Sequence, residues 1–233
     1  MTTLKNAVVL VTGGNRGIGK ALVEEAYARG ARKVYAAARD PRTVTHQDAV
    51  PLALDVTDPA SVAAAAELAG DVTVLVNNAG ISAGAGVLDG QLDDIRREFE
   101  VNFYGPLHTA RAFVPVIERN GGGHILNVHS VLSWLAEGTT YSASKAAAWS
   151  QTNSLRLALS SRSIHVTGLH MGYVDTDMTA GVDAPKATPH DIAAAALDGV
   201  ETDAYEVLAD DTSRWAKTAL AGEIADMYAQ FGL

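Results

Sequence analysis

Short apolar runs alternate along the chain with stretches in which apolar residues recur at helical spacing. The first run, at residues 7–11, is continuously apolar and stops at glycines, which is typical of a parallel strand buried on both faces. A helical pattern follows over residues 18–29, and Gly30 separates it from a second strand at residues 33–38. This succession predicts a strand–helix–strand unit with parallel strands.

The same alternation continues along the rest of the chain. Further strands are predicted at residues 50–54, 72–76, 124–128, 165–169 and 205–208. Helices are predicted in an alanine-rich stretch opened by Asp58, over residues 92–118 with Pro106 and Pro115 disturbing it, over residues 141–160, and over residues 188–197. The pattern therefore predicts an α/β fold with a doubly wound parallel seven-stranded sheet and helices on both faces, the Rossmann fold.

No repeat, linker or change of composition divides the chain, so we expect a single domain over residues 1–233. The most loop-like long stretch lies at about residues 178–188, and we expect it to be a lid over the substrate. Residues 210–233 have no assigned role. Apolar side chains recur there at roughly helical spacing, at Trp215, Leu220, Ile224 and Tyr228.

Composition narrows the possible partners and the compartment. Apolar residues make up 48% of the chain and charged residues 19%, which suits a globular protein with a large core. The net charge is −9 and the basic residues are scattered, which argues against nucleic acid and membrane partners. There is no cysteine, no leader-like start and no apolar segment near the roughly 20 residues that span a bilayer. We expect a cytoplasmic protein without disulfides.

A glycine-rich turn follows the first predicted strand. Residues 12–19 read Thr-Gly-Gly-Asn-Arg-Gly-Ile-Gly and lead directly into a helix. Glycines at 13, 17 and 19 allow a tight turn and bring a pyrophosphate against free N–H groups at the helix start. The spacing differs from the standard dinucleotide fingerprint, so a plain glycine-rich turn is the competing interpretation.

A tyrosine and a lysine lie four residues apart in a predicted helix. Tyr141 and Lys145 are then about 6 Å apart along the axis and on the same face. A phenol with a pKa near ~10 is a poor base at neutral pH, and an adjacent ammonium favours the phenolate. The pair therefore predicts a general acid/base site, although such a pair on a solvated helix face is common by chance.

These two motifs and Asn77-Asn78-Ala79-Gly80 together resemble the short-chain dehydrogenase/reductase (SDR) family, in its shorter single-domain branch. The order and spacing match from about residue 7 to residue 178. The resemblance implies an oxidoreductase with a catalytic serine, tyrosine, lysine and asparagine.

The resemblance assigns the catalytic set to Asn102, Ser130, Tyr141 and Lys145. Ser130 ends a strand in which His129 replaces the first of the family's two serines, and the interval to Tyr141 is shorter than usual, so Ser133 stays an alternative. Ser130 and Tyr141 would stabilise charge on the substrate oxygen, and Tyr141 would exchange the proton. Lys145 would lower the phenol pKa and bind the nicotinamide ribose, while Asn102 would help hold a water beside Lys145.

The end of the second strand indicates which cofactor the protein prefers. The position that is acidic in NAD-preferring relatives is Ala38, and Arg39 follows it. Arg39 and Arg16 can pair a 2′-phosphate, so NADP(H) is expected over NAD(H). The alternative is that Arg39 is an ordinary loop residue and Asp40 binds the ribose.

Other cofactor contacts follow from the resemblance. Asp55 and Val56 correspond to an adenine-contacting turn, and Gly172, Val174 and Thr176 to a nicotinamide-contacting segment in which Met171 replaces the usual proline. The full expected cofactor-binding set is Gly13, Asn15, Arg16, Gly17, Ile18, Gly19, Arg39, Asp55, Val56, Asn78, Ala79, Gly80, Tyr141, Lys145, Gly172, Val174 and Thr176.

The expected function is transfer of a hydride between nicotinamide and a ketone, aldehyde or secondary alcohol, as in a carbonyl reductase. A non-catalytic NADP-binding regulator of the same fold and a lyase similar to the halohydrin dehalogenases are the alternatives. Retention of Tyr141 and Lys145 argues against the regulator, and Lys145 with Gly13, Gly17 and Gly19 argues against the lyase. No metal site is expected, because the histidines form no metal-binding motif. A homodimer or homotetramer assembled through the helices at residues 92–118 and 141–160 is expected. Substrate identity and reaction direction stay open.

Overall fold

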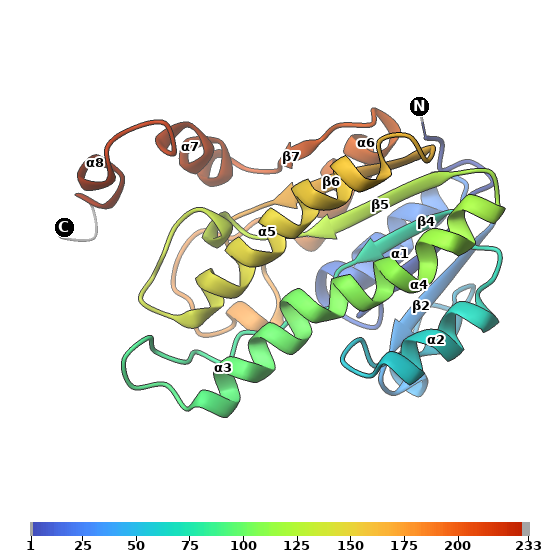
Figure 1. The fold of residues 1–233 in the computed structure, drawn as a ribbon, viewed down its shortest axis with the longest axis horizontal. Coiled ribbons are helices and arrows are strands. Elements are labelled where there is room, and N and C mark those ends of the chain that lie inside the picture. Colours follow the sequence, from blue (N-terminus) through green and yellow to red (C-terminus); the bar gives the residue numbers. More distant parts are fainter. Residues whose placement is uncertain (1, 230–233) are drawn as a thin grey trace.

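The computed structural model describes residues 2–229 and contains one parallel sheet covered by helices (Figure 1). The strand order is β3-β2-β1-β4-β5-β6-β7, and each neighbouring pair is parallel. The strands are β1 (Val8–Thr12), β2 (Lys33–Ala38), β3 (Val50–Ala53), β4 (Val74–Asn77), β5 (Gly123–Val128), β6 (Ile164–His170) and β7 (Glu206–Leu208). The predicted doubly wound seven-stranded sheet is confirmed. Its strand order reverses between β1 and β4, where ligands bind in open α/β sheets.

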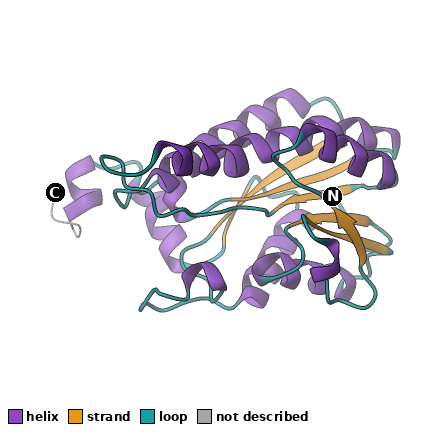
Figure 2. Cartoon of the chain, turned by 90° about the horizontal axis from the view of Figure 1, so that it is seen from below, coloured by secondary structure: helices purple, strands orange, loops and turns teal. Residues whose placement is uncertain are grey.

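Helices cover both faces of the sheet, as Figure 2 shows. They are α1 (Gly17–Ala28), α2 (Pro59–Leu68), α3 (Leu92–Phe99), α4 (Gly105–Arg119), α5 (Thr140–Leu159), α6 (Pro189–Glu201), α7 (Asp211–Ala219) and α8 (Ile224–Tyr228). Buried side chains of α1 and α6 form one core with the sheet, and those of α2, α4 and α5 form a second core on the opposite face. Burial on both faces explains why the β1 sequence is continuously apolar.

The helix predicted over residues 92–118 is divided in the structure. A π-helical turn at Glu100–Tyr104 separates α3 from α4, while Pro106 lies in the first turn of α4 and Pro115 lies inside it. The prediction that the prolines disturb one long helix was therefore wrong about the position of the break. The extra residue in a π turn is common at functional sites, and this turn carries Asn102.

The expected lid at residues 178–188 is closed by hydrogen bonds between its far end and the residues just before it. Asp175 N–H donates to the Ala187 carbonyl at 3.0 Å, and Ala187 N–H donates to the Tyr173 carbonyl at 2.9 Å. A short 3-10 turn, Asp177–Thr179, begins the segment. The segment is thus a loop closed at its base, and its role as a lid stays a prediction.

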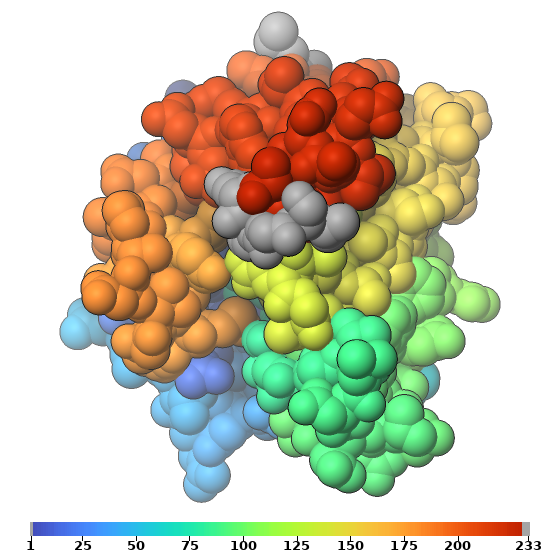
Figure 3. Space-filling view, turned by 90° about the vertical axis from the view of Figure 1, so that its left-hand side faces the viewer, coloured from blue at the N-terminus to red at the C-terminus, as the bar shows by residue number. Residues whose placement is uncertain are grey.

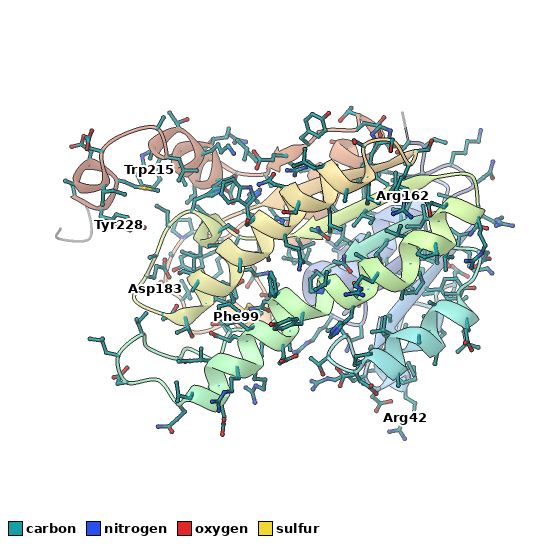
Figure 4. The ribbon with its side chains drawn as sticks, viewed as in Figure 1. Arg42, Phe99, Arg162, Asp183, Trp215 and Tyr228 are labelled. Atoms are coloured by element: carbon teal, nitrogen blue, oxygen red, sulfur yellow. The ribbon has the colours of Figure 1, made fainter. Side chains whose placement is uncertain are left out.

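The C-terminal segment leaves β7 and extends beyond the carboxyl ends of the strands as α7 and α8 (Figure 1). The apolar spacing noted in the sequence does not form one buried face: Trp215, Leu220 and Ile224 are exposed. Ala216 and Met227 are buried there instead, and Tyr228 packs beside them. Figure 4 shows Trp215 and Tyr228 on these two helices. The remainder of the predicted tail, 230–233, lies outside the described residues.

Candidate active site

The glycine turn after β1 has the backbone that the sequence predicts. Gly13 and Gly17 have φ of 64° and 52°, in the left-handed region that favours glycine. A Cβ on Gly19 would lie 2.0 Å from the Gly13 carbonyl oxygen, so the backbone segments touch there. Helix α1 starts after Arg16 without a side-chain cap, which leaves its first N–H groups available to an anion.

The loop after β4 lies directly against this glycine turn. Asn78 donates its side-chain amide to the Thr12 carbonyl at 2.9 Å, and the N–H groups of Asn78 and Ala79 both donate to the Thr12 hydroxyl at 3.0 Å. The structure therefore brings together two of the motifs, at the switch point of the sheet.

The loop after β2 carries two exposed arginines that differ in their partners. Arg39 makes no ion pair within the part of the chain that the structure describes. Arg42 donates to both carboxylate oxygens of Asp40 at 2.9 Å, and this pairing lowers the pKa of Asp40. Asp40, the alternative ribose ligand, is thus already engaged by a cation. Arg16 approaches Asp177 at 3.2 Å, with both side chains exposed.

The expected adenine and nicotinamide contacts lie at the same edge of the sheet. Asp55 accepts hydrogen bonds from the Thr57 N–H at 3.0 Å and hydroxyl at 2.7 Å, so its carboxylate shapes the turn after β3. Val56 is buried and packs on Gly105. The methyl group of Thr176 would lie 3.3 Å from a Cβ on Gly17, which places this threonine over the glycine turn.

The Gly172 N–H, by contrast, is already engaged. It donates to the Asp210 carboxylate at 2.6 Å, and the other oxygen of Asp210 accepts from the Ser213 N–H at 2.7 Å, at the start of α7. Asp210 therefore joins the nicotinamide-side segment to the C-terminal helices. Asp210 is not among the residues predicted from the sequence, although an aspartate three residues before a serine is a recognisable helix cap.

Asn102 in the π turn binds two other elements. Its side-chain oxygen accepts from the Ile81 N–H at 2.9 Å, and its amide donates to the Ile81 carbonyl at 2.9 Å and to the Ser144 hydroxyl at 3.0 Å. A Cβ on Gly80 would lie 3.3 Å from the Asn102 oxygen and 3.6 Å from Lys145 Nζ. Asn102, Gly80 and Lys145 therefore lie close together.

Tyr141 and Lys145 occupy the first turns of α5. The Lys145 ammonium is 5.7 Å from the centre of the Tyr141 ring and donates to the Val128 carbonyl at 3.1 Å. Lys145 is only 5% exposed, and burial lowers its pKa to about 8. This is not the solvated helix face that a chance pair would occupy.

The pKa of Tyr141 does not follow the sequence-based expectation. Burial and the nearby Glu98 raise the pKa of the phenol above its usual value, while the Ser130 hydroxyl opposes the rise. The lysine alone would lower the pKa of the phenol, but the free-energy cost of removing a phenolate from water raises it. Tyr141 consequently carries its proton at neutral pH.

Two serines were candidates for the site, and only Ser130 affects the pKa of Tyr141. Ser130 follows β5 and caps the next turn by accepting from the Leu132 N–H at 3.1 Å. Ser133 Oγ is buried without a hydrogen-bond partner among the described residues. The geometry favours Ser130.

A small cavity of about 10 Å³ is lined by Lys145 and has room for about one water molecule. Its polar lining comes from the ends of β4 and β5, from the π-helical turn and from α5, and consists of Asn77, Asn102, Asn127, His129, Lys145 and Thr152. Its position beside Asn102 and Lys145 suits the water that the resemblance implies.

The two histidines at strand ends are buried neighbours. His129 and His170 have ring centres 5.0 Å apart, and burial lowers the pKa of both. His129 Nε2 lies 2.9 Å from the Thr152 hydroxyl, and His170 stacks on Trp134. These contacts are those of neutral, structural imidazoles. Within residues 2–229, no group of three or more histidine or acidic side chains is placed to hold a metal.

The C-terminal helices close the opposite wall of the site. Lys217 of α7 lies 4.8 Å from the Trp134 ring centre and 5.3 Å from that of Trp149, and it pairs with Glu206 at 2.6 Å. Tyr228 accepts a hydrogen bond from the Ala136 N–H at 2.9 Å. Figure 3 shows this face, where the C-terminal helices, the loop before α5 and the loop at residues 171–188 come together.

None of the helices within residues 2–229 combines the length and apolarity of a membrane span.

Comparisons with known proteins agree with this geometry. Residues 7–187 match the short chain dehydrogenase family. An uncharacterized oxidoreductase of Staphylococcus aureus (strain USA300) is 33% identical over 213 residues, which cover 84% of this chain and 92% of that protein. The sequence relationship therefore extends over most of both chains.

Solved structures show the same likeness. A short chain dehydrogenase from Burkholderia cenocepacia in complex with NADP superposes with a TM-score of 0.94 at 35% identity, over 99% of each chain. A 3-ketoacyl-(acyl-carrier-protein) reductase from Brucella melitensis, complexed with NADH, has a TM-score of 0.80 at 27% identity and covers 87% of this chain and 94% of its own. The chain belongs to the short-chain dehydrogenase/reductase family and is an oxidoreductase of that family.

Proposed function

We propose that this protein is an NADP(H)-dependent oxidoreductase that interconverts a ketone or aldehyde with an alcohol, with Tyr141 as general acid/base. The observation that carries the proposal is the Tyr141 hydroxyl itself. It lies near the Ser130 hydroxyl, which affects its pKa, has a buried lysine one helical turn away, and lies at the same sheet edge as the glycine turn.

The residues at this edge fit a dinucleotide. The positive φ angles of Gly13 and Gly17 and the close approach at Gly19 leave no side chain between the uncapped start of α1 and a pyrophosphate. Gly80 keeps the space beside Lys145 and Asn102 free of a side chain in the same way. When bound, the nicotinamide supplies the hydride for reduction or takes it up in oxidation.

The side chains around Tyr141 have separate tasks in reduction. The hydroxyls of Ser130 and Tyr141 donate hydrogen bonds to the substrate oxygen, where negative charge develops. As the carbonyl carbon gains hydride, the O–H bond of Tyr141 breaks and its proton forms the O–H bond of the alcohol. The Lys145 ammonium stabilises the phenolate that is left, and Asn102 keeps the Gly80 loop and α5 in register.

Charge supports a preference for NADP(H) over NAD(H). Arg39 follows β2, is exposed and has no acidic partner among the described residues, so its fork of donors is available to a 2′-phosphate. Arg16 starts α1 nearby, and its exposed pair with Asp177 is of the kind that contributes little stability. The NADP complex of the 35% identical Burkholderia cenocepacia protein agrees with this choice.

The substrate wall supports a carbonyl compound with an apolar substituent. Tyr141 packs against a buried apolar cluster that includes Trp134 and Leu135 of the loop after β5 and Met227 of α8. Removal of apolar substrate surface from water would supply binding energy at this wall.

The test is to mix the protein with NADPH and a panel of ketones and aldehydes and to follow the loss of NADPH absorbance. Wild-type protein should reduce at least one apolar member, and the Tyr141→Phe variant should be slower by about a thousandfold at unchanged NADPH affinity. Equal rates for the two proteins would contradict the proposal.

A further inference from the structure

Glu98, near the end of α3, is a buried carboxyl group that the mechanism above does not use. Its exposure is 0%. Among all aspartates, glutamates, lysines and arginines of the described residues, only Glu98 and Lys145 are buried. Burial of a charge costs free energy unless hydrogen bonds or an opposite charge compensate it. Both of these groups lie close to Tyr141.

Hydrogen bonds indicate that Glu98 is ionised. One of its oxygens accepts from the Ala83 N–H at 2.7 Å, and the other is 2.6 Å from the Thr140 hydroxyl. That hydroxyl donates to Glu98 because its other acceptor, the Ala85 carbonyl, is at 3.4 Å. Two accepted bonds, one with the length typical of O–H···O⁻, are the pattern of a carboxylate.

These bonds join three elements at the site. Ala83 belongs to the loop that carries Gly80, and Thr140 is the residue directly before Tyr141. Glu98 thus fixes the start of α5 against the cofactor-side loop. Asn102 makes a second bridge between the same loop and α5, at Ile81 and Ser144.

The charge of Glu98 acts on Tyr141 in the sense opposite to that of the Lys145 ammonium. No cation pairs with Glu98 among the described residues, and its negative charge raises the pKa of the Tyr141 phenol. On the other elements near Tyr141, the titratable side chains include Tyr228 of α8, His129 after β5 and Lys217 of α7. Burial lowers the pKa of His129, so its imidazole is neutral at neutral pH, and the Lys217 ammonium is paired with Glu206.

We propose that Glu98 is a positioning residue for the reaction: it anchors the start of α5, and its negative charge keeps the Tyr141 hydroxyl protonated until the substrate oxygen takes the proton. The site then rests in the form that carbonyl reduction needs. This inference depends on the proposed function, in which Tyr141 exchanges that proton.

The first test is the Glu98→Gln variant, which keeps the size of the side chain and an acceptor for the Ala83 N–H. Tyrosinate absorbance is titrated with pH, and subtraction of matching Tyr141→Phe proteins isolates the Tyr141 signal. We expect the pKa of Tyr141 to fall by about one unit in Glu98→Gln. The pH at half-maximal rate of alcohol oxidation should fall by the same amount. An unchanged pKa in a folded Glu98→Gln protein would overturn the proposal.

Thr140→Val is the matched control, because it removes one hydrogen bond and leaves the charge. It should slow turnover severalfold without lowering the pKa of Tyr141. If the pKa of Tyr141 fell as much in Thr140→Val as in Glu98→Gln, the lost hydrogen bond and not the charge would explain the effect, and the proposal would fail.

A measurement on the wild-type protein covers the case in which Glu98→Gln does not fold. Tyr141 should titrate above the ordinary tyrosine value of about 10, despite its lysine neighbour. Titration below that value would overturn the role of Glu98. Failure of the proposed function is distinguishable, because active Tyr141→Phe protein would refute proton exchange while leaving the titration result as it stands.

Discussion

The cofactor side and the catalytic side of the site are built from different materials. On the cofactor side, glycine backbone at Gly13, Gly17 and Gly19 forms the turn, and the two arginines proposed to bind the phosphate, Arg16 and Arg39, are exposed. On the catalytic side, Asn102 and Lys145 are buried, and each has fixed hydrogen-bond partners. Cofactor choice can therefore be altered by exchanging surface charges, whereas the proton chemistry depends on groups that the core holds in place.

The largest expected effect is on the catalytic side, in Lys145→Met. Loss of the ammonium leaves the phenolate without its stabilising charge, so reduction should slow by about a thousandfold. The free energy of unfolding, by contrast, should increase in this variant. Burial holds the folded-state pKa of Lys145 at about 8, below the ordinary 10.5, so the ammonium destabilises the folded state below pH 8.

For this reason Lys145→Met should be more stable than wild type at neutral pH, by about 2 kcal/mol after the lost bond to the Val128 carbonyl is allowed for. The wild-type free energy of unfolding should rise between pH 8 and 10.5, as the folded state loses the proton first, and the variant should lack this rise. Urea titrations across this range measure both, with the surface variant Lys20→Met as control. A less stable Lys145→Met protein with the wild-type pH dependence would contradict the burial argument.

On the cofactor side, Gly19→Ala should weaken NADPH binding by about a hundredfold, because the new Cβ would overlap the Gly13 carbonyl and displace the turn. Fluorescence titration with NADPH measures the affinity. Gly70→Ala is the control, since its Cβ would lie at an ordinary 3.5 Å from the Glu67 carbonyl oxygen. Wild-type affinity in Gly19→Ala would show that the turn does not hold the cofactor.

A smaller effect is expected for Arg39→Ala. Its KM for NADPH should rise by about tenfold with little change for NADH, because one charge-assisted contact to the 2′-phosphate is lost. Arg42→Ala is a matched control, because Asp40 already engages that guanidinium. Parallel changes for both cofactors, or a larger effect of Arg42→Ala, would argue against Arg39 as the phosphate ligand.

The two sides also differ in how well the sequence predicts them. The strands, the glycine turn and the four-residue spacing of Tyr141 and Lys145 are local patterns, and the structure reproduces them. The π turn at Glu100–Tyr104 has no local signal, because its extra residue is fixed by the contacts of Asn102 with Ile81 and Ser144.

Long-range contacts explain the other differences. The local sequence around Glu98 is typical of an exposed position on an amphipathic helix. In the structure Glu98 is buried, because the loop after β4 and the start of α5 enclose it. The raised pKa of Tyr141 follows from that enclosure. In the C-terminal segment Ala216 and Met227 are buried and Trp215 is exposed, because the segment packs its Ala216 and Met227 side against the loop before α5. Assembly through α4 and α5 stays a prediction.

Proton donation by Tyr141 is tested most directly by a single turnover, in which protein saturated with NADPH is mixed with a ketone that the wild type reduces. Wild-type protein should oxidise NADPH about a thousandfold faster than Tyr141→Phe, with equal NADPH affinities. A variant that reacts within about tenfold of the wild-type rate would contradict the central role of this tyrosine.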